Sequence, residues 1–574
     1  MWWTAPVWPA KPHAHLGNSM DSEMSTLRNR RQSYDYIVVG GGTAGCIVAK
    51  RLAERRNVRV LVLEQGPKNT SWTVRIPGGL RENFKPGRRY MKWYPTVPQL
   101  QLANRVINHP RGVGLGGSSL VNGMVFLRGH REDYDRWARE GASGWSYSDV
   151  LPFFRKLETF FQGANEYRGG DGPVGVRRQE KLHPLNETFL EAGREAGYPF
   201  TDDVNGREQE GFCRFDMNVE DGYRASASFA YLEKLGGEYD VDLVTESLVC
   251  RILFDRLRAI GVQYIANGQL RTVYGEREII VCAGAIGSPQ LLLLSGIGPA
   301  DELRSCGIDP IVNLPGVGRN LQDHLELDLQ WECREAITIN GLLRADKLAW
   351  IGLQWLLFRS GMAATNQCHV GAFIRSRMEA SHPNIQLHFF PVCFDGWVPR
   401  RDTHGFRIAA GPMRPTSRGE LRLRSSDPRE PPTIDPRYLS TMHDQLELRE
   451  SYAVLQNLVS QKAFSRFRGP PLEPKSMPSG EAEVDRMIAD FSTSGFHLCG
   501  SCKMGDERDP SAVVDPMTRV RGIDALRVVD ASIMPSIVSS NINAPVMMIA
   551  ERASDLIRGT QWMRPQNVLI GRQD

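Results

Sequence analysis

One segment near the start of the chain, residues 34–45, constrains the fold more than any other. It reads Tyr-Asp-Tyr-Ile-Val-Val-Gly-Gly-Gly-Thr-Ala-Gly, so a β-branched run leads into a glycine-rich turn. A helical pattern follows, and a second apolar run, Val-Arg-Val-Leu-Val-Leu, ends in Glu64. Strand, turn, helix, strand and acid in this order are typical of a Rossmann-type βαβ unit.

Three glycines of this turn have separate physical tasks. Gly40 makes the tight turn, Gly42 lets the backbone approach a pyrophosphate, and Gly45 lets the helix lie close to the strand. The start of the helix offers unpaired N–H groups to phosphates, and Glu64 stands where an acid can bind ribose hydroxyls. We therefore expect the chain to bind a dinucleotide. A second glycine pattern, at residues 112–117, follows no strand and predicts no second site.

Length and composition exclude several classes of protein. With 574 residues the chain is long enough for two or more domains. Its net charge of +4 is small for this length, which argues against a nucleic-acid partner. The ten cysteines are scattered, and several lie in apolar runs, which indicates reduced thiols in a cytoplasmic-type compartment.

The most apolar stretch, residues 349–358, is too short for a membrane span, which needs roughly 18–20 apolar residues. We expect it to be a core helix. The alternative is an interfacial helix that brings the protein to the inner face of a membrane as a peripheral partner.

Five further motifs, taken with the first segment, resemble those of the glucose–methanol–choline (GMC) oxidoreductase family. They include Gly-Gly-Ser-Ser-Leu-Val-Asn, Leu-Gln-Asp-His and His-Leu-Cys-Gly-Ser-Cys-Lys-Met-Gly. Within the family the chain is most similar to choline dehydrogenases and related flavin-dependent primary-alcohol dehydrogenases. The motifs lie, in the family's order, at residues 114–124, 284–299, 314–324, 497–505 and 526–545.

The resemblance implies an α/β plus α+β fold: a Rossmann-like FAD-binding domain, topped by a substrate domain built on an antiparallel sheet flanked by helices. Because strand-and-helix units of the first type return in the middle and at the end of the chain, we expect the FAD-binding domain to be discontinuous. The expected parts are a disordered leader (1–32), the FAD-binding domain (33–160, 216–325 and 496–560), an excursion toward the substrate domain (161–215), the substrate-binding domain (326–495) and a tail (561–574).

The same resemblance implies which residues contact FAD. Some oxidases of the family attach the flavin covalently through a His in the Gly-Gly-Ser-Ser segment, and the matching position here, about Val121, has no nucleophile. We therefore predict non-covalent FAD. The implied cofactor-binding residues are Gly40, Gly42, Thr43, Ala44, Gly45, Glu64, Gly116, Gly117, Ser118, Asn122, Gly123, Met124, Val249, Ala283, Asp530, Ala531, Asn543, Ala544 and Pro545.

Alcohol oxidation by a flavin needs a base for the hydroxyl proton, and a fixed hydrogen-bond donor beside the alkoxide-like oxygen. The resemblance implies His497 as the catalytic base and Asn543 as the hydrogen-bond partner of the substrate oxygen. Cys499 and Cys502 form a CxxC beside His497. No fourth ligand and no small βαβ unit accompany them, so we expect neither a metal nor a redox dithiol.

The substrate pocket departs from the choline dehydrogenases at one position. They look similar around residues 364–375 but carry a Glu where this chain has His369, which leaves choline in doubt. His388 matches them and is expected to help bind the alkoxide, with an ordinary strand histidine as the alternative. Cys368 completes the expected substrate-binding residues.

We expect oxidation of a primary alcohol to an aldehyde by hydride transfer to flavin N5, with oxygen or a quinone as electron acceptor. The alternative is a non-redox flavoprotein of the same fold, a hydroxynitrile lyase or a photodecarboxylase. The photodecarboxylases share Cys368 but look to carry an Arg in place of His388, which argues against that reaction. The sequence leaves the oligomeric state open.

Overall fold

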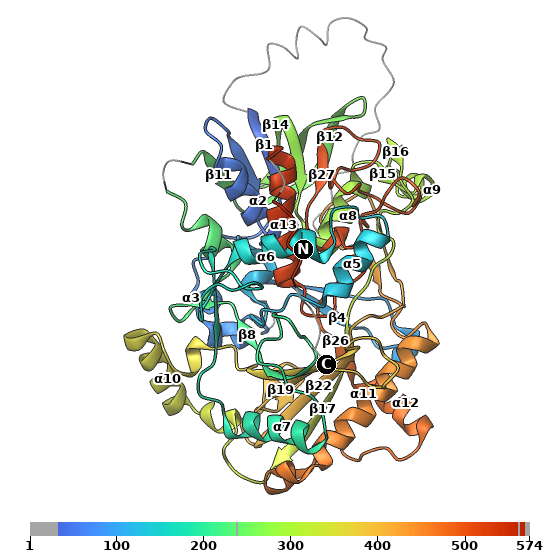
Figure 1. Ribbon diagram of the computed structural model, residues 1–574. Coiled ribbons are helices and arrows are strands. Elements are labelled where there is room, and N and C mark those ends of the chain that lie inside the picture. The colour runs from blue at the N-terminus through green and yellow to red at the C-terminus, as the bar shows by residue number, and fades with distance from the viewer. Residues whose placement is uncertain (1–32, 86, 237–238, 561–562, 569–574) are drawn as a thin grey trace, which may run out of the picture.

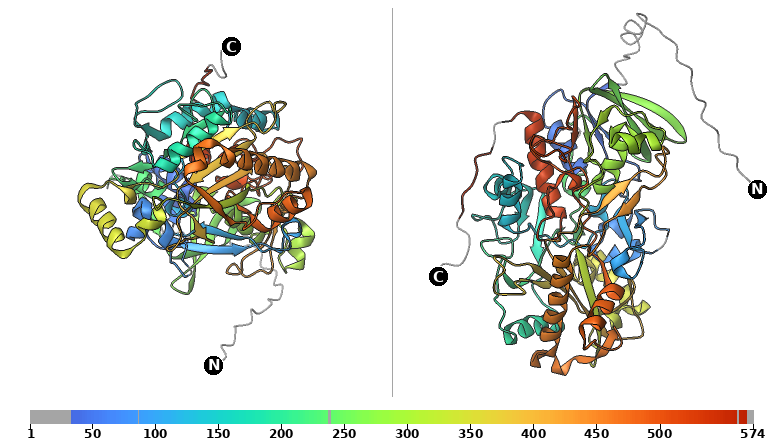
Figure 2. Two further views of the ribbon diagram at one scale, coloured as in Figure 1. Left: turned by 90° about the horizontal axis from the view of Figure 1, so that it is seen from below. Right: turned by 90° about the vertical axis from the view of Figure 1, so that its right-hand side faces the viewer.

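The structure is a computed structural model that describes residues 33–85, 87–236, 239–560 and 563–568. The expected leader, residues 1–32, and residues 561–562 and 569–574 of the expected tail lie outside the described residues. Two large sheets, each with its own helices, occupy the upper and lower halves of the molecule in Figure 1. The side view shows the same stacking of the two halves (Figure 2).

The upper sheet has seven strands in the order β11-β2-β1-β14-β13-β12, with β27 paired to β14. The strands from β11 to β14, and β27, run parallel, whereas β12, β13 and β14 pair antiparallel. Every residue of β2 is buried, as expected for a parallel strand covered on both faces. The strands are β1 (Ser33–Val39), β2 (Val60–Leu63), β11 (Val241–Val244), β12 (Ser247–Asp255), β13 (Arg258–Ala266), β14 (Gln269–Val281) and β27 (Leu526–Val528).

Three helices of the upper half begin at one edge of this sheet. Helix α2 (Thr43–Ala53) follows β1, and α8 (Gly284–Leu294) follows β14. Helix α13 (Asn543–Arg558) follows β27 after a loop and packs along α2. Since all three follow the carboxyl ends of parallel strands, their N-termini converge there, the usual location of a ligand in such a sheet.

The lower sheet also has seven strands, in the order β25-β17-β22-β19-β18-β7, with β26 paired to β17, and all its pairs are antiparallel. Helices α7 (Pro184–Glu195), α11 (Met442–Ser460) and α12 (Glu481–Phe491) pack against it. The strands are β7 (Gly211–Arg214), β17 (Leu325–Cys333), β18 (Val370–Ile374), β19 (Ile385–Phe390), β22 (Gly405–Pro412), β25 (Arg468–Glu473) and β26 (Ser492–Ser494).

Alternation along β17 separates the two faces of the lower sheet. Leu327 and Leu329 join the apolar core under the helices, whereas Glu326 and Asp328 point to the other side. Register places His388 opposite Ala409, and Ala409 opposite Asp328, so these residues share the second face. The polar face of the lower sheet is thus turned away from its helices, and the expected combination of an α/β and an antiparallel layer is confirmed.

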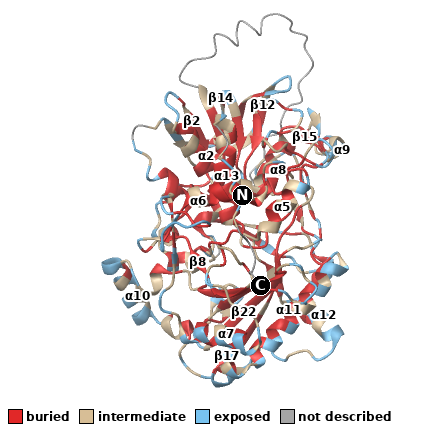
Figure 3. Cartoon of the chain, viewed as in Figure 1, coloured by how far each residue is buried: buried red, intermediate tan, exposed pale blue. Residues whose placement is uncertain are grey.

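Helix α10 (Ala345–Phe358) contradicts the core assignment made from its apolar sequence. It lies at the side of the lower half in Figure 1, and its outer surface is exposed (Figure 3). Trp350, Leu356, Leu357 and Phe358 are 60–70% exposed, whereas Trp355 is buried. The prediction of a core helix is therefore wrong. Within the described ranges, every helix is too short or too polar to cross a bilayer.

The remaining helices and strands lie outside the two large sheets. They are α3 (Trp72–Arg75), α4 (Leu80–Asn83), α5 (Arg131–Arg139), α6 (Tyr147–Leu157), α9 (Ala300–Ser305), β3 (Met91–Pro95), β4 (Asn108–Gly112), β5 (Glu158–Phe160), β6 (Val174–Arg178), β8 (Asp216–Met217), β9 (Val219–Glu220), β10 (Tyr223–Arg224), β15 (Ile297–Gly298), β16 (Val312–Asn313), β20 (Phe394–Asp395), β21 (Val398–Pro399), β23 (Glu420–Arg422) and β24 (Thr433–Asp435).

Candidate active site

One cavity of about 350 Å³ joins the glycine turn after β1 to the predicted catalytic histidine. Its wall includes Gly40, the start of α8, the loop at residues 117–125, and both His497 and Asn541. Of the residues predicted to bind the cofactor, fifteen line it. The four that do not are Gly45, Gly116, Ala544 and Pro545.

The glycines of this wall fit a dinucleotide. A Cβ atom at Gly45 would lie 1.9 Å from the carbonyl oxygen of Gly40, so only glycine lets α2 approach the turn. At Gly123 and Gly284 a Cβ would meet no atom within 4 Å, and at Gly42 none closer than 3.8 Å. These glycines border free space, so the cavity is wide enough for a ligand to approach the backbone directly.

Glu64 connects three backbone segments beside the glycine turn. Its carboxylate accepts hydrogen bonds from the backbone N–H groups of Gly41 and Gly66, both at 2.8 Å, and of Gly114 at 3.1 Å. Burial raises the pKa of Glu64, and the three N–H groups act against that rise. Because the side chain also lines the cavity, its remaining acceptor site is placed to receive a ribose hydroxyl.

Helix N-termini supply the positive end of the cavity. Thr43 at the start of α2 donates a hydrogen bond to Asn543 Oδ1 (3.1 Å), the first residue of α13. Asp530 receives the N–H of Gly284 (2.9 Å) and thereby fixes the start of α8. Three helix dipoles therefore point at one space, which suits an anionic ligand such as a pyrophosphate.

The structure corrects the predicted active-site pair. Asn541 Nδ2, not Asn543, lies against His497 Nε2, at 3.1 Å. Asn543 lines the cofactor cavity but is turned to Thr43, because it begins α13 beside α2. Asn541 precedes the helix by two residues, in the segment that passes the lower sheet.

A second histidine, which the sequence prediction missed, sets the tautomer of His497. His324 Nε2 lies 3.0 Å from the carbonyl oxygen of Met413, which can only accept, so this nitrogen carries a proton. Burial lowers the pKa of His324 to about 4, so its Nδ1 is an unprotonated acceptor at neutral pH. His497 Nδ1, 3.0 Å away, is then the donor to it, and the lone pair of His497 is on Nε2, beside Asn541.

His497 is neutral at physiological pH. Burial lowers its pKa well below the usual range, and the nearby Arg111, His324 and His388 side chains, which would repel a second positive charge, lower it further. A neutral imidazole whose Nε2 lone pair faces a cavity is competent to take up a proton without first losing one.

The predicted residue His388 lies beside this pair. Gln386 Nε2 bridges His388 Nε2 (3.1 Å) and Asn541 Oδ1 (3.2 Å), which fixes the orientation of the Asn541 amide. On its other side, His388 Nδ1 faces Glu326 Oε1 at 3.6 Å. Burial raises the pKa of Glu326 to about 7. The sheet thus places a carboxylate near the reactive histidines, and the sequence prediction missed it.

His369 and Cys368 have different surroundings. Among the described residues, His369 has no hydrogen bond to the other predicted site residues and its Nε2 is buried without a partner. Burial lowers the pKa of His369, and the nearby His183, the N-cap of α7, lowers it further. Cys368 is buried in a small apolar cluster. Burial raises the pKa of its thiol, and the nearby Glu326 raises it further. Position 369 therefore carries no carboxylate, and the carboxyl group that the structure shows beside a predicted site residue is that of Glu326, 3.6 Å from His388.

The missed residues left signals in the sequence. His324 ends the Leu-Gln-Asp-His motif, and Glu326 follows it in a strand that alternates Leu with charged residues. Asn541 stands two positions before the Asn of the Asn-Ala-Pro motif, within the same motif at residues 526–545.

Comparison with known proteins identifies the family of the chain. Residues 34–326 and 415–550 match the N- and C-terminal parts of the GMC oxidoreductases. Mitochondrial choline dehydrogenase of Mus musculus is 46% identical over 549 residues, 94% of this chain and 92% of that protein. Oxygen-dependent choline dehydrogenase of Vibrio vulnificus is 44% identical, over 93% and 96%. The crystal structure of pyridoxine 4-oxidase from Mesorbium loti has a TM-score of 0.83 at 29% identity, covering 92% of this chain and 100% of that one.

The fold and the site define a flavin-binding oxidoreductase, and the chain belongs to the GMC oxidoreductase family. Its cofactor is FAD. It is an enzyme that oxidises the CH–OH group of a small-molecule alcohol.

Proposed function

We propose that the enzyme oxidises a primary alcohol to an aldehyde with His497 as the catalytic base. The observation that supports this proposal most directly is the contact between the Nε2 lone pair of His497 and the N–H of Asn541. A hydroxyl oxygen placed at this point can lose its proton to His497 while it accepts a hydrogen bond from Asn541.

The reaction balances with two acceptors. His497 Nε2 takes the hydroxyl proton, and the bond from carbon to hydrogen breaks with both electrons leaving carbon as a C=O bond forms. FAD, when bound, supplies the two-electron acceptor for that hydride. Asn541 and the neutral His388–Gln386 pair hold the oxygen and keep the site ordered during the transfer.

We further propose a cationic alcohol of the choline type as substrate. Glu326 Oε1 would lie 3.1 Å from a Cβ atom at Gly495, a residue of the cavity wall, so the carboxylate is close to the cavity. Phe84 and Phe496 also line the cavity, and the ring of Trp397 lies 4.9 Å from that of Phe496. A carboxylate and aromatic faces together suit a quaternary ammonium group, and the choline dehydrogenases cited above support the same class.

Anaerobic reduction of the flavin tests the proposal. Choline, a neutral alcohol of similar size such as 3,3-dimethylbutan-1-ol, and benzyl alcohol should be mixed with the oxidised enzyme. We expect bleaching of the flavin absorbance by choline and much slower bleaching by its neutral isostere. Cyanide release from a cyanohydrin with the flavin still oxidised would instead support the lyase alternative. Reoxidation by oxygen or by a soluble quinone then identifies the electron acceptor.

We also propose that α10 contacts a lipid surface. Its outward side carries Trp350, Leu353, Leu356, Leu357 and Phe358, and Arg344, Lys347 and Arg359 lie at its ends. Apolar side chains on one face with basic residues at the border are typical of a helix that lies in the interface of a membrane.

A further inference from the structure

The backbone before the catalytic histidine has an unfavourable conformation. Phe496 has φ +64°, in the left-handed region that a bulky residue rarely adopts. Such a conformation persists only where the surroundings enforce it. Because His497 is the next residue, the conformation of Phe496 decides where the imidazole points.

Side chains from three segments hold this backbone. Ser494 Oγ accepts the N–H of Phe496 at 2.7 Å. Arg111 Nη1 donates to the carbonyl oxygen of Phe496 at 2.7 Å, and Asp323 Oδ1 accepts the N–H of His497 at 2.7 Å. The carbonyl group of Phe496 and the N–H group of His497 belong to one peptide bond. Arg111 and Asp323 therefore form hydrogen bonds to opposite ends of the same peptide plane.

Arg111 and Asp323 together form a clamp on the Phe496–His497 peptide bond. The carboxylate of Asp323 is itself held in place by hydrogen bonds. Asp323 Oδ2 accepts hydrogen bonds from the Tyr438 hydroxyl, at 2.5 Å, and from Ser494 Oγ. Asp323 also precedes His324, so adjacent residues hold the backbone N–H and the ring Nδ1 of His497. The base is therefore positioned through its main chain as well as through its ring.

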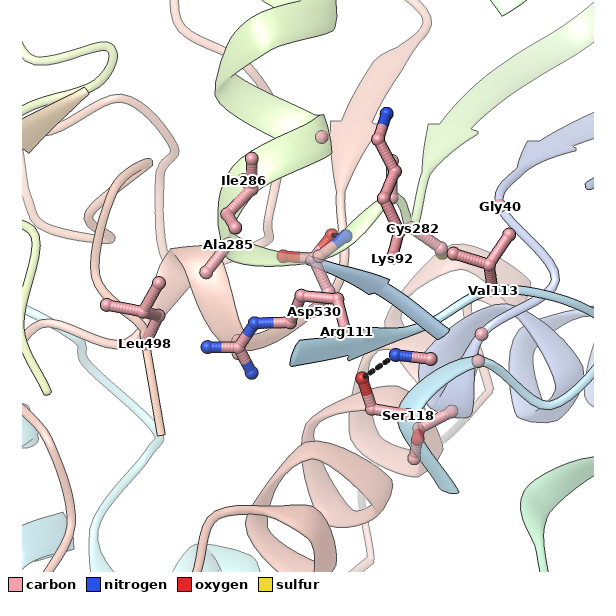
Figure 4. A pocket seen from close by; sticks show the side chains of 18 of the residues that line it. Gly40, Lys92, Arg111, Val113, Ser118, Cys282, Ala285, Ile286, Leu498 and Asp530 are labelled. Atoms are coloured by element: carbon pink, nitrogen blue, oxygen red, sulfur yellow. Dashed lines mark hydrogen bonds between the residues drawn. The ribbon is translucent and has the colours of Figure 1, made fainter. Parts of the chain in front are cut away.

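The cationic side links the clamp to the cofactor cavity. Arg111 lies in β4, and the next residue, Gly112, donates to Ser118 of the cofactor loop at 3.2 Å. Arg111 lines the cavity, and its Nε and Nη2 are buried with no hydrogen-bond partner among the described residues. In Figure 4 its guanidinium points toward Leu498, on the side of the pocket that carries the base. Its charge therefore acts on both the cavity and the base.

We propose that Arg111 is a positioning residue, which with Asp323 clamps the Phe496–His497 peptide bond and so aims His497 Nε2 at the substrate. The inference rests on the proposed role of His497 as base. A neutral side chain at position 111 would release the carbonyl oxygen of Phe496, which lets residue 496 relax toward negative φ and turns the imidazole away. It would also remove a positive charge that opposes protonation of His497.

Three variants of the FAD-loaded enzyme test the clamp, with choline as the reductant. Arg111→Gln should slow flavin reduction about tenfold or more, within the roughly 10²–10⁴-fold that general-base catalysis supplies. It should also move the acid limb of the pH profile to higher pH and lower the flavin midpoint potential. Arg111→Lys keeps the charge, so we expect the limb and the potential near their original values and a smaller loss of rate.

The third variant, Phe496→Gly, separates positioning from charge. Glycine adopts positive φ without strain, so residue 496 no longer needs the clamp as strongly. In this background Arg111→Gln should cost less, with a coupling of roughly 3- to 100-fold between the two changes. Effects that simply multiply would overturn the proposal.

Crystal structures keep the test independent of substrate. In Arg111→Gln we expect residue 496 to leave positive φ and His497 to lose its contact with Asn541. If both remain in place, the clamp is refuted, whether or not any alcohol reduces the flavin. If the backbone moves but no alcohol reduces the wild type, the proposed function fails and the clamp stands.

Discussion

His497 Nε2 and Asn541 Nδ2 lie 3.1 Å apart at the end of the cofactor cavity, and this contact unites the acceptor and the donor that alcohol oxidation needs. The orientation of the His497 ring is fixed on its opposite side, because His324 Nδ1 accepts a hydrogen bond from His497 Nδ1. The arrangement leaves one lone pair and one N–H group facing the same point.

Asn541 and Asn543 should therefore differ in what they contribute. Asn541→Ala removes a donor to the developing negative oxygen, so we expect flavin reduction to slow by roughly 10²–10³-fold. Asn543→Ala breaks the bond to Thr43 and should weaken FAD retention, with a small effect on the rate once FAD is saturating. Stopped-flow absorbance and FAD titration measure the two effects. The opposite ranking would return the catalytic role to Asn543.

His324 should act through the tautomer of His497. His324→Leu leaves the Nδ1–H of His497 without an acceptor and lets the proton move to Nε2, so we expect about a tenfold or larger loss of flavin reduction. In His324→Asn, the amide oxygen can stand near the original Nδ1 and accept the hydrogen bond from His497 Nδ1–H, so part of the rate should return. Equal losses in the two variants would show that the ring of His324, and not its acceptor, matters.

Much of the fold could be predicted because local sequence patterns agree with the burial of the elements in the folded chain. The β-branched run before Gly40 predicts a buried strand, and β1 is buried from Tyr36 to Val39. The core prediction for helix α10 was wrong, because an apolar sequence does not reveal whether the side chains are buried against protein or lie on the surface. Its burial could be learned only from the surrounding elements.

The site was predicted less completely, for a geometric reason. His497 and the glycines sit in motifs whose spacing fixes their place, whereas Asn541 and Asn543 differ only by where α13 begins. Glu326 reaches the site through strand pairing with residues far away in the chain, which spacing does not reveal. The same holds for Arg111, whose partner is the carbonyl oxygen of Phe496.

Glu326 should give substrate binding a specific dependence on pH. Its pKa is raised to about 7 by burial, so the carboxyl is neutral below this value and negative above it. For choline, KM should therefore fall as the pH rises from 6 to 8, whereas KM for the neutral isostere should change little. Glu326→Gln should remove the dependence and raise KM for choline. A KM for choline that is constant over this range in the wild type would contradict the role of this carboxylate.

The flavin should be released intact when the enzyme is denatured. Val121 stands in the cofactor loop where covalent family members place a histidine, and it lines the cavity without a nucleophilic atom. Precipitation with acid should leave a colourless pellet and a yellow supernatant, and Val121→Ala serves as the matched variant. Yellow colour that stays with the polypeptide would require another side chain of the cavity wall to have bonded to the flavin.

Helix α10 should determine whether the enzyme binds lipid. We expect the purified protein to sediment with vesicles that contain phosphatidylglycerol, and less with pure phosphatidylcholine. Leu357→Ser with Phe358→Ser should reduce partition at least tenfold, because a buried Leu or Phe side chain contributes about 1.5–3 kcal/mol. Met378→Ser, at a 90% exposed position outside this helix, is the control and should bind like the wild type. Equal binding by both variants would exclude α10 as the contact, and a dimer in solution that only the α10 variant dissociates would assign the same face to a second copy of the chain.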